Sequence, residues 1–393
     1  MPDLTTVTSD HTATRVRAYL VERQDEMVDL LGRLVLAESP SLEPESQGVV
    51  QSILGEAFTD IGYDVIHLPG EITGGQLHVL DRGREGAPYQ LMVGHTDTVW
   101  PRGTLDRMPM TVENGHLRGP GAFDMKGGLV QIVFALRALR ELELEAAVAP
   151  TVLVNSDEEI GSPESKVHIE RLAAAADRAL ILEPAMGPEG LIKTARKGIS
   201  RYTLHIHGRA AHAGLEPERG VSAIRELALQ IEHIYKLNAP HEGITVNVGV
   251  IDGGSRPNVV AEGARAEIDV RVLSDEQAEQ IDRALRSLTP VTPGIELELR
   301  GQLEASPLER TPRNRALWEA VRRAGSRLGL TLEETIAGGA SDGNTTSCFT
   351  ATVDGLGTLG DGAHADHEFV DITTMAERAA MLALVLLEPP LTF

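Results

Sequence analysis

The chain contains 393 residues, 42% of them apolar and only 3% aromatic, and its formal net charge at pH 7 is −22. Because one hydrophobic core rarely serves more than about 250–300 residues, this length predicts two domains. The negative charge repels polyanions, and the small number of aromatic residues leaves little surface on which bases could stack. We therefore expect neither nucleic acid nor an anionic membrane as a partner.

The N-terminal stretch, residues 1–17, is polar and lacks the apolar run of a signal peptide. No stretch of the chain approaches the roughly 20 apolar residues of a membrane span. The single cysteine, Cys348, cannot form an internal disulfide bond, and its apolar neighbours predict a buried small residue rather than a nucleophile. These features predict a soluble, cytoplasmic protein.

The first part of the chain alternates helices and strands. Apolar residues at helical spacing predict helices over residues 13–37 and 49–61, the second ended by Gly62. The further predicted elements, in chain order, are strands at 64–67, 76–80 and 90–93, a helix at 125–139, a strand at 151–154, a helix near 164–176 and a strand at 179–182. This alternation predicts a two-domain α/β fold, with helices on both faces of a mixed central sheet.

The pattern changes near Lys197. Residues 200–207 alternate strictly between apolar and polar side chains, which predicts a half-buried strand. A helix at 220–237, strands at 244–251 and 264–272, a helix at 275–288 and a strand at 295–300 follow. This β-α-β-β-α-β order predicts an inserted ferredoxin-like α+β domain with one open sheet face.

The first pattern resumes after Pro307. A helix is predicted at 313–328, a strand at 331–334, a Gly-rich turn at 337–344, a strand at 350–353 and a helix at 372–387. We therefore predict one domain in two segments, 1–196 and 309–393, with the inserted domain at 197–308 between them.

Two motifs in the first part could belong to a metal centre. The strand at 90–93 delivers His95 at its carboxyl end, where open α/β sheets bind ligands, and the Asp97 carboxylate can accept the other ring N–H. Asp124 follows a Gly-rich run and begins a helical pattern, so it is either a helix N-cap or a carboxylate between two metals. Neither motif is decisive alone.

Two later strands also end in carboxylates. Asp157, Glu158 and Glu159 directly follow a buried strand, and three adjacent acids are costly there unless a cation neutralises them. One acid of such a cluster can bind metal while its neighbour acts as a general base. Glu183 ends the next strand, and Pro184 stiffens the turn after it.

Histidines complete the set. His364 and His367 are three residues apart, and His212 follows the alternating strand, where it would ordinarily be a turn histidine. Imidazole and carboxylate groups together suit a two-zinc hydrolytic site, in which an ion keeps one position open for water.

In this order the motifs resemble those of the di-zinc metallopeptidases that include glutamate carboxypeptidase, acetylornithine deacetylase, succinyl-diaminopimelate desuccinylase and aminoacylase. The chain is most similar to the glutamate carboxypeptidase-like branch. The resemblance spans about residues 15–388 and rests on His95–Asp97, Gly121–Gly128, Asp157–Ser162, Glu183–Pro184, Gly208–Gly214 and His364–Val370.

The resemblance implies two zinc ions per chain, with cobalt or manganese as alternatives. His95 and Glu183 would bind one ion, and Glu159 and His364 the other. Asp124 would bridge them, and the peptide bond after Asp124 would be cis. The family's His-x-x-x-Glu-aromatic spacing selects His364 over His367 as the ligand.

The resemblance also implies roles around the metals. Asp97 would orient His95, and Glu158 would be the general base, taking a proton from a bridging water and giving it to the leaving nitrogen. His212 would stabilise the oxyanion, usually from the partner subunit, so the inserted domain would be a lid and a dimer surface. The implied substrate-binding residues are Asn258, Arg271 and Gly339.

The expected function is therefore zinc-dependent hydrolysis of an amide bond in a small peptide or an N-acyl amino acid, by a homodimer of the carboxypeptidase or aminoacylase type. Glutamate-releasing relatives carry an arginine where this chain has Ile336, which disfavours an acidic leaving residue. An N-carbamoyl amino acid hydrolase would share the same site. A non-catalytic binding protein would have no need of Glu158. A serine hydrolase is disfavoured, because we expect no Gly-x-Ser-x-Gly motif at a strand-helix elbow.

Overall fold

A computed structural model describes residues 10–84 and 86–392, so residues 1–9 of the predicted first segment lie outside the described range. The chain divides into two units, each with a hydrophobic core of its own. The first unit takes in the chain up to Ala195, then Arg310–Ala337, then the chain from Ser341 onward. The second consists of Arg196–Glu309 and the short segment Gly338–Ala340. No helix in the described part of the chain is long and apolar enough to cross a membrane.

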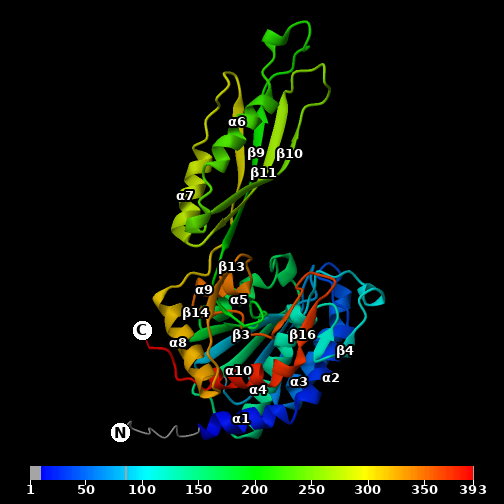
Figure 1. Cartoon of the computed structure of the whole chain (residues 1–393), viewed down its shortest axis with the longest axis vertical. Coiled ribbons are helices and arrows are strands. Elements are labelled where there is room, and N and C mark those ends of the chain that lie inside the picture. The colour runs from blue at the N-terminus through cyan, green and yellow to red at the C-terminus, as the bar shows by residue number, and fades with distance from the viewer. Residues whose placement is uncertain (1–9, 85, 393) are drawn as a thin grey trace. The chain divides into compact units, whose positions relative to one another are not determined.

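The first unit is built on a six-stranded sheet (Figure 1). Its strands lie in the order β1 (Tyr63–Leu68), β2 (Gln76–Asp81), β6 (Ala149–Asn155), β3 (Tyr89–His95), β7 (Arg178–Ile181) and β14 (Ala351–Val353). The last four are parallel, whereas β2 runs antiparallel to both of its neighbours, so the sheet is mixed, as predicted. The strand β14 comes from the last part of the chain, and its Thr352 pairs with Ala179 of β7.

The central strands are buried on both faces, which explains why they read as unbroken apolar runs. Along β3, Leu91 and Val93 belong to the core under α5, while Met92 belongs to the core on the opposite face, as the two-residue period of a strand requires. The helices on that opposite face are α1 (His11–Val21), α2 (Gln24–Leu36), α3 (Gln47–Asp60), α4 (Gly127–Glu141), α8 (Pro312–Arg327) and α10 (Met375–Leu386). The helix α5 (Lys166–Ala173) covers the other face and contacts the short α9 (Asp342–Ser347).

Several local predictions are wrong. The single helix predicted over 13–37 is broken at Arg23, which has a non-helical backbone and binds back to Tyr19: its guanidinium donates to the Tyr19 carbonyl oxygen (3.0 Å) and stacks on the ring. The helix α9 begins within the predicted Gly-rich turn and runs three residues beyond it, and Cys348 at the end of that helix is exposed rather than buried. The sequence pattern also misses short strands, namely β8 (Ile192–Arg196), which pairs with β13 (Glu334–Ala337), and the small antiparallel sheet β15 (Gly360–Asp361), β16 (Phe369–Asp371), β5 (His116–Arg118) and β4 (Thr111–Glu113).

The second unit is a four-stranded antiparallel sheet with two helices on one face (Figure 1). The strands lie in the order β10 (Thr245–Gly253), β11 (Gly263–Val272), β9 (Gly198–His207) and β12 (Glu296–Ala305), and the helices are α6 (Ala223–Tyr235) and α7 (Asp275–Arg286). This is the predicted β-α-β-β-α-β order. Along β9, Tyr202 and Leu204 lie in the core with the helices, whereas Thr203 and His205 lie on the other face.

Candidate metal centre

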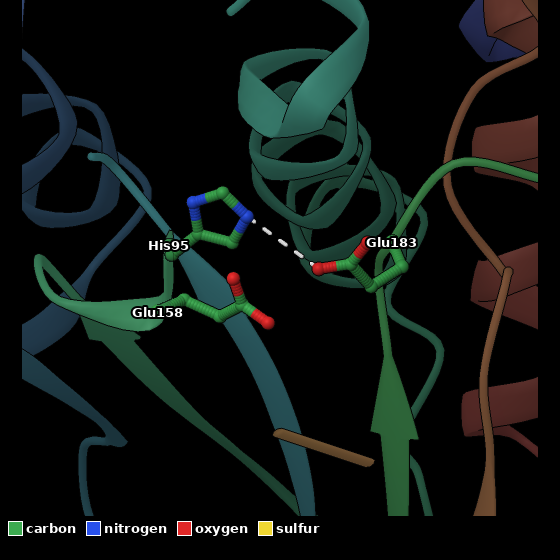
Figure 2. Close-up of side chains that lie close together, drawn as sticks. All are labelled: His95, Glu158 and Glu183. Atoms are coloured by element: carbon green, nitrogen blue, oxygen red, sulfur yellow. Dashed lines mark ion pairs between the residues drawn. The ribbon is translucent and has the colours of Figure 1, made fainter. Parts of the chain in front are cut away.

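Three neighbouring strands of the central sheet deliver polar side chains to one edge. His95 is the last residue of β3, Glu158 begins a short helical turn after β6, and Glu183 follows β7. Because β6, β3 and β7 are adjacent and parallel, their carboxyl ends meet. Figure 2 shows the three side chains pointing toward one another. One imidazole nitrogen and one oxygen of each carboxylate all lie within 4.8 Å of one another.

Asp124 lies between two histidines. Its Oδ1 is 3.5 Å from His95 Nε2, and its Oδ2 is 3.4 Å from His364 Nε2. Each histidine nitrogen faces a second carboxylate, because Glu183 Oε1 lies 3.4 Å from that of His95 and Glu159 Oε2 lies 3.0 Å from that of His364. The peptide bond after Asp124 is cis, as expected. The predicted ligands thus form two sets that share one aspartate.

Asp97 holds both His95 and the acidic loop. The His95 Nδ1 lies 2.9 Å from the Asp97 carbonyl oxygen and 3.4 Å from its Oδ1, so the other ring nitrogen is the one turned toward Asp124. The Asp97 carboxylate also accepts hydrogen bonds from the backbone N–H groups of Glu158 and Glu159, at 3.2 and 3.1 Å, and from Ser41 Oγ at 2.7 Å. Asp97 therefore holds the histidine chiefly through its backbone carbonyl oxygen and the two glutamates through its carboxylate.

The site concentrates negative charge. Burial raises the pKa of Glu158 well above its ordinary value, and the neighbouring charge of Glu183 raises it further. Burial alone would lower the pKa of His95, but the surrounding carboxylates, that of Asp124 foremost, raise it well above its usual range. Hydrogen bonding to Asp124 helps to raise the pKa of His364 to about 10. The raised pKa values of the two histidines reflect the carboxylates that surround them.

The donor set fits two divalent cations. His95 Nε2 is buried and makes no hydrogen bond to any group in residues 10–84 and 86–392. Ligand atoms bound at about 2.0–2.1 Å around a tetrahedral zinc ion lie about 3.3–3.4 Å apart. The facing nitrogen and oxygen atoms here are separated by 3.0 to 3.5 Å, so their spacing matches that of zinc ligands.

Two further carboxylates, whose roles the sequence did not reveal, hold the loops of the site. Glu368 accepts hydrogen bonds from the backbone of the loop that carries Asp124. Asp342 accepts hydrogen bonds from Asn155 Nδ2 and Ser162 Oγ, both at 2.6 Å, at the two ends of the acidic loop. Burial raises the pKa of Asp342 to about 6. The available signals were positional: Glu368 is the glutamate of the His-x-x-x-Glu-aromatic pattern, and Asp342 lies in the Gly-rich turn.

The remaining four predicted residues, His212, Asn258, Arg271 and Gly339, belong to the second unit, not to the unit that holds the ligand set. His212 is exposed, and its Nδ1 accepts hydrogen bonds from two backbone N–H groups, each at 3.1 Å. Asn258 and Gly339 are exposed, and the guanidinium of Arg271 pairs with Asp269 at 2.8 Å.

The expectation about serine chemistry needs a correction. Residues 339–343 read Gly-Ala-Ser-Asp-Gly and lie between β13 and α9, so a Gly-x-Ser-x-Gly motif does stand between a strand and a helix. Ser341 nevertheless serves as the helix N-cap. Its buried Oγ accepts from the Gly343 N–H at 3.0 Å and donates to Asp354 at 2.6 Å. This serine is engaged in holding the turn, which does not fit an exposed nucleophile.

Comparisons with known proteins find similar sequences and similar folds. The model of peptidase family M20/M25/M40 matches residues 91–388. Carboxypeptidase G2 of Pseudomonas sp. (strain RS-16) is 27% identical over 384 residues, which cover 93% of this chain and 90% of that protein. Among solved structures, a tripeptidase from Staphylococcus aureus superposes with a TM-score of 0.76 at 22% identity, covering 93% of this chain and 98% of the other. The Bacillus subtilis YXEP protein, a dinuclear metal binding peptidase, gives a TM-score of 0.69 at 15% identity, with 93% and 98% covered.

Proposed function

Because the chain belongs to peptidase family M20/M25/M40, we propose that its metal centre is the active site of a zinc-dependent exopeptidase or aminoacylase. As a member of this family, the chain is a hydrolase of peptide or amide bonds. The proposed substrates are small peptides or N-acyl amino acids. The observation that supports this most directly is Asp124, whose two carboxylate oxygens face two different histidines.

We assign His95 and Glu183 to one zinc ion and Glu159 and His364 to the other, with Asp124 shared. When bound, zinc supplies a Lewis acid for the substrate carbonyl and makes a water molecule more acidic. The protein's own part is to hold these five ligands in place and to keep the remaining glutamate, Glu158, close by without a ligand role.

Glu158 is the proposed general base. It lies beside His95 and Glu183, and burial raises its pKa well above the ordinary glutamate value. A carboxyl group with a raised pKa can take a proton from the attacking water and give it to the leaving nitrogen at a pH near neutral. A non-catalytic binding protein would gain nothing from a buried acid at this position.

His212 is the proposed donor to the oxyanion. Its Nδ1 accepts two backbone hydrogen bonds, so in the neutral ring the proton is on Nε2. An exposed imidazole fixed in this tautomer is ready to donate to a developing negative charge. Asn258, Arg271 and Gly339 remain proposed substrate-binding residues, and the uncharged Ile336 supports a leaving residue that is not acidic.

The second unit is the proposed lid and dimerisation domain. The strand β10 forms one edge of its sheet, and an edge strand presents unpaired backbone groups to a partner. Two apolar side chains on this strand, Val250 and Ile251, are 48% and 61% exposed. A second copy of the chain could cover them, which sedimentation of the wild type and of Ile251→Glu would test.

The test of the catalytic proposal is amine release from three substrate panels: dipeptides, N-acetyl amino acids and N-carbamoyl amino acids. Glu158→Gln should keep two zinc ions per chain and lose about 10³-fold in rate, because it removes the base and leaves the ligands. Glu145→Gln, an exposed change after α4, is the matched control and should behave as wild type. Near-normal turnover by Glu158→Gln would overturn the base, and a zinc-loaded wild type that releases nothing would overturn the substrate class.

A further inference from the structure

Glu368 is a buried carboxylate with an unusually complete set of donors. Its side chain is 1% exposed. Oε1 accepts from the backbone N–H groups of Phe123 (2.9 Å) and Asp124 (3.1 Å). Oε2 accepts from the N–H of Gly121 (3.0 Å) and from Trp100 Nε1 (2.9 Å). The four N–H donors offset part of the cost of burying one negative charge, and burial still raises the pKa of Glu368 above its ordinary value.

Because of its position in the chain, Glu368 connects two loops of the metal centre through these hydrogen bonds. It follows His364 by four residues, and its own N–H donates to the Ala365 carbonyl oxygen at 2.9 Å, within the same turn. Its carboxylate reaches the loop that presents Asp124. One side chain therefore ties the loop of the distal histidine to the loop of the shared aspartate.

The two metal positions differ in how firmly the fold itself holds their ligands. His95 ends a central strand and is 1% exposed, and Glu183 lies two residues after the end of another central strand. His364, in contrast, lies on a loop, has a side chain that is 53% exposed and adopts a backbone φ of 60°. A loop-borne ligand keeps its place only if neighbouring contacts fix it.

We propose that Glu368 is a positioning residue that fixes Asp124 and His364 together and so determines the affinity of the metal position formed by Glu159 and His364. The proposal rests on the two-metal function proposed above, and it adds that the two positions depend unequally on one residue that binds neither ion. Groups that orient metal ligands typically change affinity by about 10–100-fold when they are altered.

Glu368→Gln is the decisive substitution. A glutamine offers one oxygen, and its NH2 group would face two N–H donors, so the replacement loses two hydrogen bonds and sets donors against each other. Glu368→Asp keeps the charge but withdraws the carboxylate by one methylene. Trp100→Phe removes one donor and leaves the three backbone donors in place.

The experiment is calorimetric titration of the metal-free full-length chain with Zn²⁺. We expect two binding steps in the wild type. We assign the weaker step to the position of Glu159 and His364, because His364 is exposed on a loop whereas His95 is buried at a strand end. In Glu368→Gln this step should lose about tenfold or more in affinity, while the tighter step changes by less than about threefold. Glu368→Asp should show the same selective loss, and it decides the question if the glutamine variant does not fold. Trp100→Phe should have the smallest effect of the three.

Asp366→Asn is the matched control, because Asp366 lies in the same loop and its side chain is 78% exposed. It should bind zinc as the wild type does. Unchanged affinities in both Glu368 variants, or equal losses at both steps, would overturn the positioning role. A wild type that binds fewer than two ions would instead overturn the proposed function, so the two failures are distinguishable.

Discussion

The two units of this chain use their sheets in opposite ways. The first buries both faces of its central strands, so polar groups collect where the strands end, and His95 and Glu183 stand there. The second packs one face of its sheet on two helices and leaves polar side chains such as Thr203 and His205 along the other. The first arrangement concentrates chemistry at one edge, and the second offers a broad surface. Changes in the first unit should therefore abolish the reaction, and changes in the second should modulate it.

The largest expected effect is that of His95→Ala. It should remove one zinc ion per chain and lower kcat/KM by about 10⁴-fold or more, because a lost metal forfeits several kcal/mol of transition-state stabilisation. Metal analysis and amine release check both parts. His241→Ala, at a side chain that is 79% exposed in the second unit, is the control and should be neutral. Full metal content in His95→Ala would contradict the assignment of His95 as a metal ligand in the first unit.

His212→Ala sharpens the comparison, because it tests the second unit. It should lower kcat by about 10²–10³-fold, the usual cost of losing an oxyanion donor, and leave the zinc content unchanged. Steady-state kinetics measures the loss of kcat, and metal analysis measures the zinc content. Zinc loss in this variant would contradict the proposal that the first unit binds the metals while His212 of the second unit only stabilises the oxyanion.

The smallest expected effect is on the free energy of unfolding, when one methyl group is removed from a strand of each unit. Thr352 in β14 is fully buried, and Thr352→Ser should cost about 1 kcal/mol of unfolding free energy. Thr203→Ser on the outer face of β9 should stay within about 0.5 kcal/mol. Urea unfolding of both variants measures the difference. Equal costs would show that the outer face of β9 is as tightly packed as the central sheet.

The places of most proposed ligands in the fold could be predicted, because these residues follow an unbroken apolar strand or a glycine-rich loop. Glu183 is an example, since Leu180–Leu182 can hardly be anything but buried and the next residue must emerge at the sheet edge. The identity of His364 could not be settled from its own neighbourhood, where His367 offers the same chemistry, and it needed the family spacing. The structure places His364 beside Asp124 and Glu159.

Other features could not be derived from apolar spacing or from residue type. The helix α9 is rich in Gly, Ser, Thr and Asn, residues that favour turns, and it forms because Ser341 caps it with a reciprocal bond to Asn344. The role of Glu368 depends on backbone N–H groups about residues 121–124, and such groups have no signature in a sequence. The break at Arg23 likewise arises from a contact with Tyr19 that helical spacing does not encode.

The pairing of Thr352 with Ala179 also dictates an order of events during synthesis. The strand β7 emerges before the second unit and β14 after it, so β7 must wait as an open edge while the whole insertion is made. The insertion has its strands contiguous in the chain and its own core, so it can close first. His364 emerges later still, and we expect the complete two-metal site to form last, as the step that locks a chain already nearly folded.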